Sequence, residues 1–262
     1  MHHGNRSILL PALFLTLIII LPLQAKQNEN VSAMIAAGDS FSTKTFENQK
    51  ALDAFMKAYA IEPNNYEILW RISRTYIDLG EHQPSATKDD KIKQLETYQK
   101  SLDFAELAVK ANPNESMGYT RRAIANGRVA LFKGVWDSID LVKQVKADCE
   151  KAIQLDKENP AAYYVLARTH AKLCEKPKVI RWPLGLSWAN YEDARANYEK
   201  AIAMRPTFIM YRLDAARTYT ELDEYDKAKE QLTKIAALPT EDEDDNQFRK
   251  EAKELLEKIK DK

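Results

Sequence analysis

Apolar residues recur along this chain at helical spacing, and the runs that they form end alike. Five segments close with an apolar-periodic stretch followed by a break: FMKAYAIEPNN, AELAVKANPNE, CEKAIQLDKEN, YEKAIAMRPTF and LTKIAALPTED. Three of them carry proline five residues after a small residue, at Pro63, Pro113 and Pro206. Proline ends a helix because it lacks an N–H and clashes with the preceding turn. A second amphipathic run follows each of the first four breaks, so the pattern predicts five units of helix, turn, helix and break over residues 32–240.

An octet recurs inside these units and indicates how their helices pack. ARTYTELD at 216–223 is preceded by SRTYIDLG at 73–80 and ARTHAKLC at 167–174, each with a small residue, Arg-Thr, a ring and then leucine. Residues four apart on a helix share a face. We therefore expect the small residue and the ring to face the partner helix, and the arginine to point toward the inner, concave surface.

The last unit has the most regular spacing, with 34 residues from Ala201 to Ile235. A 34-residue pair of antiparallel helices, with small residues at the crossing and a closing proline, resembles the tetratricopeptide repeat. Small residues matter at the crossing because two helix axes approach closely only where side chains are short. The resemblance implies an all-α superhelix, a solenoid of about five helix pairs, and a binding role.

The middle units are longer because residues are inserted between their two helices. The insertions are EHQPSATKDDKIKQL, the FKGVWDSID region and EKPKVIRWPLGLSW. This layout, with the closing LPTEDEDDNQFRKEAKELLEKI, is similar to the regulator of microtubule dynamics family, whose members carry a tetratricopeptide domain with lengthened helices or loops. The resemblance implies the fold with its lengthened intra-repeat insertions. A role at microtubules is not transferred, because the N-terminus predicts export.

A C-terminal helix is predicted over residues 244–261. Its apolar stripe leaves lysines and glutamates on the other faces and consists of Phe248, Ala252, Leu255, Leu256 and Ile259. A solenoid needs a polar-backed cap on its last repeat. We therefore expect this helix to be a capping helix.

The first residues predict a targeting segment. The basic stretch MHHGNR precedes the apolar run SILLPALFLTLIII and a small-residue site at Ala25, which is the pattern of a secretory signal peptide. We expect cleavage of residues 1–25, a solenoid domain of residues 26–262, and a secreted or periplasmic bacterial protein. A membrane anchor formed by an uncleaved N-terminal helix is the alternative.

Composition and motifs narrow the functional classes. Lys+Arg and Asp+Glu balance at 39 each, which argues against nucleic acid as a partner because such binders carry a basic surplus. The chain has no G-x-S-x-G, H-E-x-x-H, phosphate loop or Cys/His metal spacing. EDEDD at 241–245 lacks the spaced ligands and central glycine of a calcium loop. We expect no catalytic residue, no metal and no cofactor, so the chain is predicted not to be an enzyme.

The candidate binding residues lie on the first helices of the units. The octet arginines and their neighbours are predicted to line the groove: Trp70, Arg74, Arg128, Tyr164, Arg168, Lys172 and Arg217. In one interpretation the arginines cover apolar neighbours and pair with acids on the next repeat. In the other they form a ladder of donors for peptide carboxylates or a lipid phosphate, with Trp70 and Tyr164 as stacking surfaces. The two interpretations are compatible.

The segment RWPLGLSW is a second candidate, because Trp182 and Trp188 lie in an insertion beside two leucines. One alternative is that it folds back over the helices, as most aromatic residues with apolar neighbours do. The other is that it presents an apolar edge to a membrane or a protein.

The predicted function is non-catalytic binding of a protein or peptide of acidic character in the concave groove of an exported scaffold. The alternative is binding or carriage of a lipid or another apolar small molecule in a tunnel closed by the insertions. A deep apolar cavity would favour this alternative, whereas a flat polar groove would favour a peptide. A hydrolase or other enzyme would require clustered acids or a buried histidine beside a pocket.

Overall fold

The computed structural model of the chain describes residues 17–262, which form twelve α-helices and no β-strand. The α-helices are α1 (Leu17–Ser40), α2 (Asn48–Ile61), α3 (Tyr66–Glu81), α4 (Lys88–Ala111), α5 (Ser116–Lys133), α6 (Ile139–Leu155), α7 (Pro160–Cys174), α8 (Lys178–Arg181), α9 (Tyr191–Met204), α10 (Ile209–Glu221), α11 (Tyr225–Ile235) and α12 (Asp245–Lys258). Three short elements join them: η1 (Phe41–Thr45), η2 (Val135–Ser138) and η3 (Trp182–Leu184).

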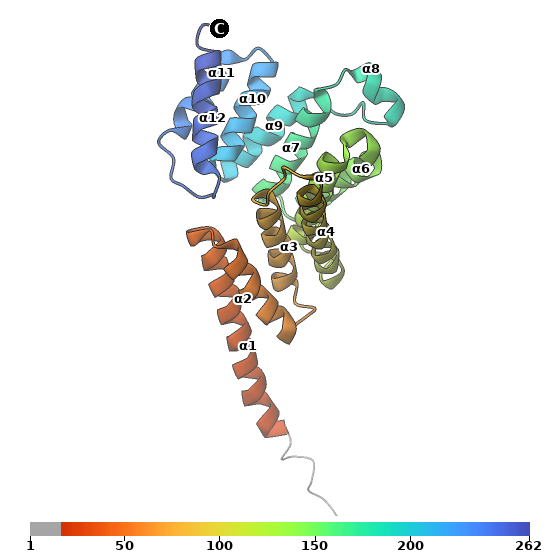
Figure 1. The fold of residues 1–262 in the computed structure, drawn as a ribbon, viewed down its shortest axis with the longest axis vertical. Helices are drawn as coiled ribbons and strands as arrows, with labels where there is room; N and C mark the ends of the chain where they lie inside the picture. The colour runs from red at the N-terminus through yellow and green to blue at the C-terminus, as the bar shows by residue number, and fades with distance from the viewer. Residues whose placement is uncertain (1–16) are drawn as a thin grey trace, which may run out of the picture.

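The long helices pack as consecutive pairs. The pairs are α1 with α2, α3 with α4, α5 with α6, α7 with α9, and α10 with α11, while α12 packs on α10 and α11. Figure 1 shows the pairs following one another from α1 and α2 at one end to α10, α11 and α12 at the other. Ala252 on α12 and Ile259 directly after it are buried, and Phe248 packs against the same core. The predicted all-α solenoid with a C-terminal capping helix is confirmed.

The three insertions take different forms. The first lengthens α4 to 24 residues, against 14 in α2. Thr87 starts this longer helix with a capping box, because its hydroxyl accepts the Asp90 N–H while the Asp90 carboxylate accepts the Thr87 N–H, both at 3.1 Å. The second insertion contains η2, and the third contains α8 and η3. The inserted residues therefore form helix as well as loop.

The small residues of the octets lie at the helix crossings. Ser73, Ala167 and Ala216 have no exposed surface. The rings that follow them are buried at His170 and Tyr219 and half-buried at Tyr76. The octet therefore packs as its pattern predicts, with the short side chain and the ring on the face that meets other helices.

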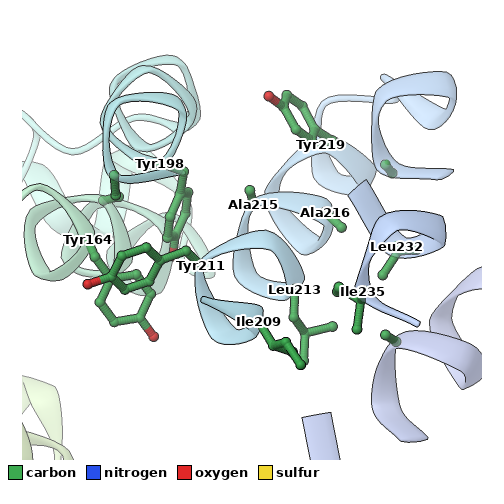
Figure 2. Packing of buried hydrophobic residues seen from close by; sticks show 14 of the residues in the cluster. Tyr164, Tyr198, Ile209, Tyr211, Leu213, Ala215, Ala216, Tyr219, Leu232 and Ile235 are labelled. Carbon is green, nitrogen blue, oxygen red and sulfur yellow. The ribbon is translucent and has the colours of Figure 1, made fainter. Parts of the chain in front are cut away.

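The largest core cluster lies in the C-terminal half and is rich in tyrosine. The rings of Tyr164 and Tyr211 stack with centroids 4.7 Å apart, and the Tyr198 centroid lies 5.9 Å from that of Tyr164. Figure 2 shows these three rings together, beside the aliphatic packing of α10 with α11. Stacked and tilted rings at these separations add to the stabilisation from burial. This cluster joins α7 to α9 and α10, and so holds one wall of the site described below.

The N-terminal helix α1 continues through Ala25 without a break. Residues 1–16, which make up most of the predicted leader, lie outside the described residues. Within residues 17–262, no helix is both long enough and apolar enough to cross a membrane.

A pair of glycine substitutions tests the packing of α1 on α2. A Cβ at Gly38 would lie 2.4 Å from Cε1 of Phe55, whose side chain is fully buried. Gly38→Ala should therefore lower the free energy of unfolding by about 2 kcal/mol, because overpacking outweighs the gain in helix propensity. At Gly127, on α5, the nearest atom to an added Cβ is 4.0 Å away. Gly127→Ala should raise stability by about 0.5 to 1 kcal/mol. Urea unfolding measures both, and stabilisation by Gly38→Ala would contradict the packing.

Candidate functional site

A cavity of about 420 Å³ lies on the inner side of the solenoid. The first helices of the second, third and fourth pairs, α3, α5 and α7, supply much of its wall. Residues of η1, α2, α6, α10, α12 and the 241–244 segment also line it. The apolar part of the wall consists of Ile77, Ile124, Leu131, Val142, Val145, Val165, Leu173, Phe208, Met210 and Phe248. Both the volume and the mainly apolar lining are those of ligand sites in proteins.

Six arginine and lysine side chains line the same cavity. They are Arg74, Arg121, Arg128, Arg168, Lys172 and Arg205. Arg168 and Lys172 are four residues apart on α7, and Arg121 and Arg128 are seven apart on α5, so each pair lies on one helix face. Acidic side chains also line it, at Asp78, Glu81 and residues 241–244. The cavity is therefore apolar in its wall and charged around it.

The structure brings five of the seven predicted groove residues to this cavity: Arg74, Arg128, Tyr164, Arg168 and Lys172. Tyr164 is buried, and its ring stacks on Tyr211 rather than standing free. Trp70 lies outside the lining, with the Arg71, Arg74 and Arg121 guanidinium groups 4.2, 5.6 and 5.6 Å from its ring centroid. Their role in binding stays a prediction.

Arg217, the seventh predicted groove residue, is turned away from the cavity. It donates to Asp214 at 2.6 Å and pairs with Glu251 on the capping helix. Asp214 also accepts the Tyr164 hydroxyl at 2.8 Å, and Arg168 in turn donates to Tyr164 at 3.1 Å. Asp214 therefore links α7, α10 and, through Arg217, α12.

Most of the cavity cations have an acid within the chain, as the packing interpretation expects. Arg74 pairs with Asp39 at 3.3 Å, Arg205 with Glu241 at 2.8 Å, and Lys172 with Glu175 at 2.8 Å; Arg128 pairs with Glu81, and Arg168 lies 4.0 Å from Asp214. Apart from Lys172–Glu175, which lies within the end of α7, these ion pairs connect different elements of the solenoid. They leave the cavity with fewer unpaired charges than the number of its charged residues.

Arg121 is different from the other arginines of the cavity. It makes no ion pair with any residue of the described range 17–262, and its Nε is buried without a hydrogen-bond partner. Burial, together with the neighbouring Arg74, lowers the pKa of Arg121 to about 10, although Asp78 raises it in part. Arg121 is half-buried, and a partly desolvated cation without an ion pair destabilises a folded protein. Arg121 was not among the predicted groove residues. The third unit has Ile124 where the other units have the octet arginine, so the octet pattern indicates no arginine there, and Arg121 lies three residues earlier on α5.

An acidic segment closes the cavity between the first and last units. Asn48, at the start of α2, donates to Glu243 at 2.7 Å across 195 residues of sequence. His82, at the end of α3, lies 3.1 Å from Asp244. Figure 1 shows the corresponding end of α12 facing the end of the α1–α2 pair. The first insertion takes part in this closure through His82, its second residue, and EDEDD at 241–245 supplies the other side of both contacts.

The closing contact carries a titrating histidine. Burial lowers the pKa of His82, but hydrogen bonds to the Asp78 carbonyl and the Asp244 carboxylate outweigh it, so the pKa is raised above its ordinary 6.5. A raised histidine pKa means that its contribution to stability is full below pH about 6.5 and is lost as the pH rises through the higher folded-state pKa.

Asp78 provides a pH test of the cavity. Burial raises its pKa from 3.8 to about 7, although Arg74 and Arg121 lower it in part. Its contribution to the free energy of unfolding is therefore present below pH about 4 and is lost as the pH rises to about 7. Asp78→Asn should remove this loss, so urea unfolding from pH 4.5 to 7.5 should show a flatter profile than the wild type. Asp103→Asn, at an exposed position of α4, is the control, and equal slopes in both variants would contradict the assignment.

One end of the segment RWPLGLSW folds back over the helices and the other end is exposed, so each of the two predicted alternatives holds for part of it. Trp188 folds back, with its ring 4.9 Å from that of the buried His170, and Leu186 is fully buried. Trp182 remains 71% exposed. The segment is thus anchored at one end and open at the other.

Metal-binding and redox groups are sparse in the described part of the chain. No group of three or more His, Cys, Asp or Glu side chains there is arranged to hold a metal ion. Cys149 and Cys174 are both unpaired thiols, the first buried and the second half-buried. Burial raises the pKa of Cys149 well above its ordinary value, so this thiol stays protonated.

The chain is similar in sequence to one protein family over most of its length. The family described as Regulator of microtubule dynamics protein 1-3 matches residues 34–260. Regulator of microtubule dynamics protein 3 of Bos taurus is 27% identical over 205 residues, which cover 74% of this chain and 42% of that protein. Regulator of microtubule dynamics protein 1 of Mus musculus is 26% identical over 201 residues, covering 74% and 65%. The chain therefore spans less than two thirds of the length of these relatives.

A solved structure supports the fold independently. A thermophilic TPR protein of Thermus thermophilus is similar, with a TM-score of 0.63 at 18% identity, and the match covers 85% of this chain and 98% of that one. The predicted resemblances to the tetratricopeptide repeat and to the regulator of microtubule dynamics family are confirmed.

One sequence prediction is wrong. The N-terminal pattern predicts a secreted or periplasmic bacterial protein, but the matching relatives are mammalian regulator of microtubule dynamics proteins. The inference depended on an apolar N-terminal run in a chain with few cysteines, and neither feature is specific to bacterial export.

Proposed function

Because the chain belongs to the Regulator of microtubule dynamics protein 1-3 family and folds as a tetratricopeptide-like solenoid, we propose that it is a non-catalytic scaffold that binds a segment of another protein in its inner cavity. Solenoids present extended inner surfaces to their partners. The fold alone does not name a ligand, so the proposal depends on the chemistry of the cavity.

The observation that carries the proposal is the unpaired Arg121. Its guanidinium lies 5.6 Å from the Trp70 ring centroid and near Arg74. Asp78 attracts it, but it forms no ion pair within residues 17–262, whereas the other arginine and lysine side chains of the cavity do. A carboxylate from a partner would supply the missing counter-charge, and charge-assisted hydrogen bonds to arginine are among the strongest in proteins. The partner segment therefore carries an acidic residue for Arg121 and apolar residues for the wall around Ile124 and Val165.

A second candidate function is favoured by the enclosure of the cavity. The wall is mainly apolar, and the 241–244 segment closes one side through Asn48 and His82. An amphiphile with an anionic head and an apolar tail would satisfy Arg121 and fill the same wall. This is the lipid-carrier alternative. Here the acidic segment takes part in closing the cavity, a role that the sequence analysis gave to the insertions.

Purification of the full chain from the cells that naturally produce it separates the two candidates. Mass spectrometry under native conditions records whether the chain carries an added mass, and tiling peptides from any co-purifying protein locate the segment that binds. We expect a protein at fixed stoichiometry and a peptide that combines acidic and apolar residues. A lipid mass on the chain would instead support the second candidate, and a bare chain without a partner would overturn both.

A further inference from the structure

A short apolar surface stands exposed on the third insertion, away from the cavity. Val179, Ile180 and Trp182, here called the apolar tip, are 76%, 50% and 71% exposed. They account for half of the six large apolar side chains that are exposed among the described residues, within four positions of the chain. Figure 1 shows α8 at the outer edge of the solenoid, far from α1 and α2. The clustering calls for a functional explanation, because single exposed apolar residues are ordinary and clusters are not.

The apolar tip is held in place from beneath. Arg181 is only 6% exposed, and its guanidinium donates to the carbonyls of Lys176 at 2.9 Å, Leu186 at 3.1 Å and Ala189 at 2.7 Å. Gly185 adopts φ +70°, where glycine is favoured, and lets the chain turn back toward the buried Leu186. The exposure of the apolar tip is therefore imposed by ordered structure and does not result from fraying.

Free positive charge surrounds the apolar tip. Lys143, Lys176 and Lys178 are exposed, and none forms an ion pair with a residue of the described chain. Lys143 lies beside the tip's turn, since a Cβ added at Gly185 would be 3.7 Å from its Cε. Glu175, the neighbouring acid, is engaged by Lys172 at 2.8 Å. The surface therefore presents tryptophan and aliphatic side chains within a cationic border.

We propose that the apolar tip docks on the surface of a bilayer that contains anionic lipids. Tryptophan prefers the interface between headgroups and acyl chains, and lysines near it attract anionic headgroups. Val179 and Ile180 enter the acyl boundary beside Trp182, while Lys176 and Lys178 stay at the headgroups. The preformed turn removes most of the ordering cost of insertion. This docking uses none of the cavity residues, so it does not depend on the proposed function, and each can be tested without the other.

The test measures the depth of Trp182 in vesicles of 70% phosphatidylcholine and 30% phosphatidylserine with brominated acyl chains. The full chain is used, and the difference between the wild type and Trp182→Phe isolates the Trp182 signal from the other three tryptophans. We expect bromolipid quenching that Trp182→Phe removes. Val179→Ser with Ile180→Ser should weaken vesicle partitioning about tenfold, and Lys176→Gln with Lys178→Gln about thirtyfold. The matched control, Ile92→Ser, changes an exposed apolar residue on α4 and should leave partitioning unchanged.

Two results would overturn the proposal. The apolar run at residues 8–20 offers the chain another route to vesicles, and vesicle binding without quenching of Trp182 would assign the contact to that run. A chain that sediments as a dimer until Val179 and Ile180 are changed, again without quenching, would assign the apolar tip to a contact between two copies. Circular dichroism melts of every variant confirm that the comparison is among folded proteins.

Discussion

Arg121→Gln should weaken binding of the partner about a hundredfold, because it removes the counter-charge for a buried carboxylate. The same change should leave the free energy of unfolding unchanged or raise it. Burial lowers the pKa of Arg121 to about 10, and no described residue forms an ion pair with it, so in the free protein the attraction to Asp78 offsets only part of the cost of desolvating this charge. Loss of binding with retained stability would indicate that the residue serves ligand binding and does not stabilise the fold.

The two quantities are measured on the same preparations. Titration with the captured partner gives the dissociation constant, and urea unfolding gives the stability. Lys91→Gln is the matched control, because it removes one positive charge from an exposed site on α4 outside the cavity. A variant at Arg121 that loses stability and binding together would mean that the arginine is a packing residue, and unchanged binding would remove it from the site.

Asp214→Ala should destabilise the protein by about 3 kcal/mol, because it leaves the buried Tyr164 hydroxyl without an acceptor and two arginines without their shared carboxylate. Asp214 is 8% exposed and accepts hydrogen bonds from Tyr164 at 2.8 Å and Arg217 at 2.6 Å. Arg168 and Arg217 are partly exposed and can recover hydration, which keeps the loss below that of a fully buried pair.

A thermal melt measures this effect. For a chain of this size the melting temperature should fall by about 6 to 12 °C. Glu254→Ala, an exposed acid on α12, serves as the control and should shift the melt by no more than about 2 °C. A variant at Asp214 that melts with the control would contradict its role in joining α7 to α10.

The helix pairing was predictable because local patterns encode it. The octets place Ser73, Ala167 and Ala216 at helix crossings, and a small residue leaves few other packing solutions. Arg74 and Arg168, which follow the small residue in two of the octets, both line the cavity. Local spacing determines a helix face, so these positions follow from the sequence without knowledge of the neighbours.

The closure of the cavity was not predictable in this way. Glu243 meets Asn48 across 195 residues, and the curvature that brings them together is a sum of small rotations at every helix crossing. Arg217 has the same position in its octet as Arg168, yet it pairs with Glu251 on the capping helix and does not line the cavity. Arg121 was missed for a related reason: what distinguishes it is the absence of an ion pair, and that depends on which distant residues lie near it in the fold. Pairing among distant charges depends on tertiary geometry, which a single octet does not carry.

Photocrosslinking from the cavity rim tests the central claim most directly. Leu131 lines the cavity and is 41% exposed, so a benzoylphenylalanine there reaches a bound ligand. The same residue at Ile92, 46% exposed and outside the cavity, is the control. We predict that the Leu131 position crosslinks to one protein segment containing an acidic residue, that the Ile92 position does not, and that Arg121→Gln abolishes the product. Equal crosslinking from both positions, or a product that Arg121→Gln leaves unchanged, would contradict the assignment of this cavity as the binding site.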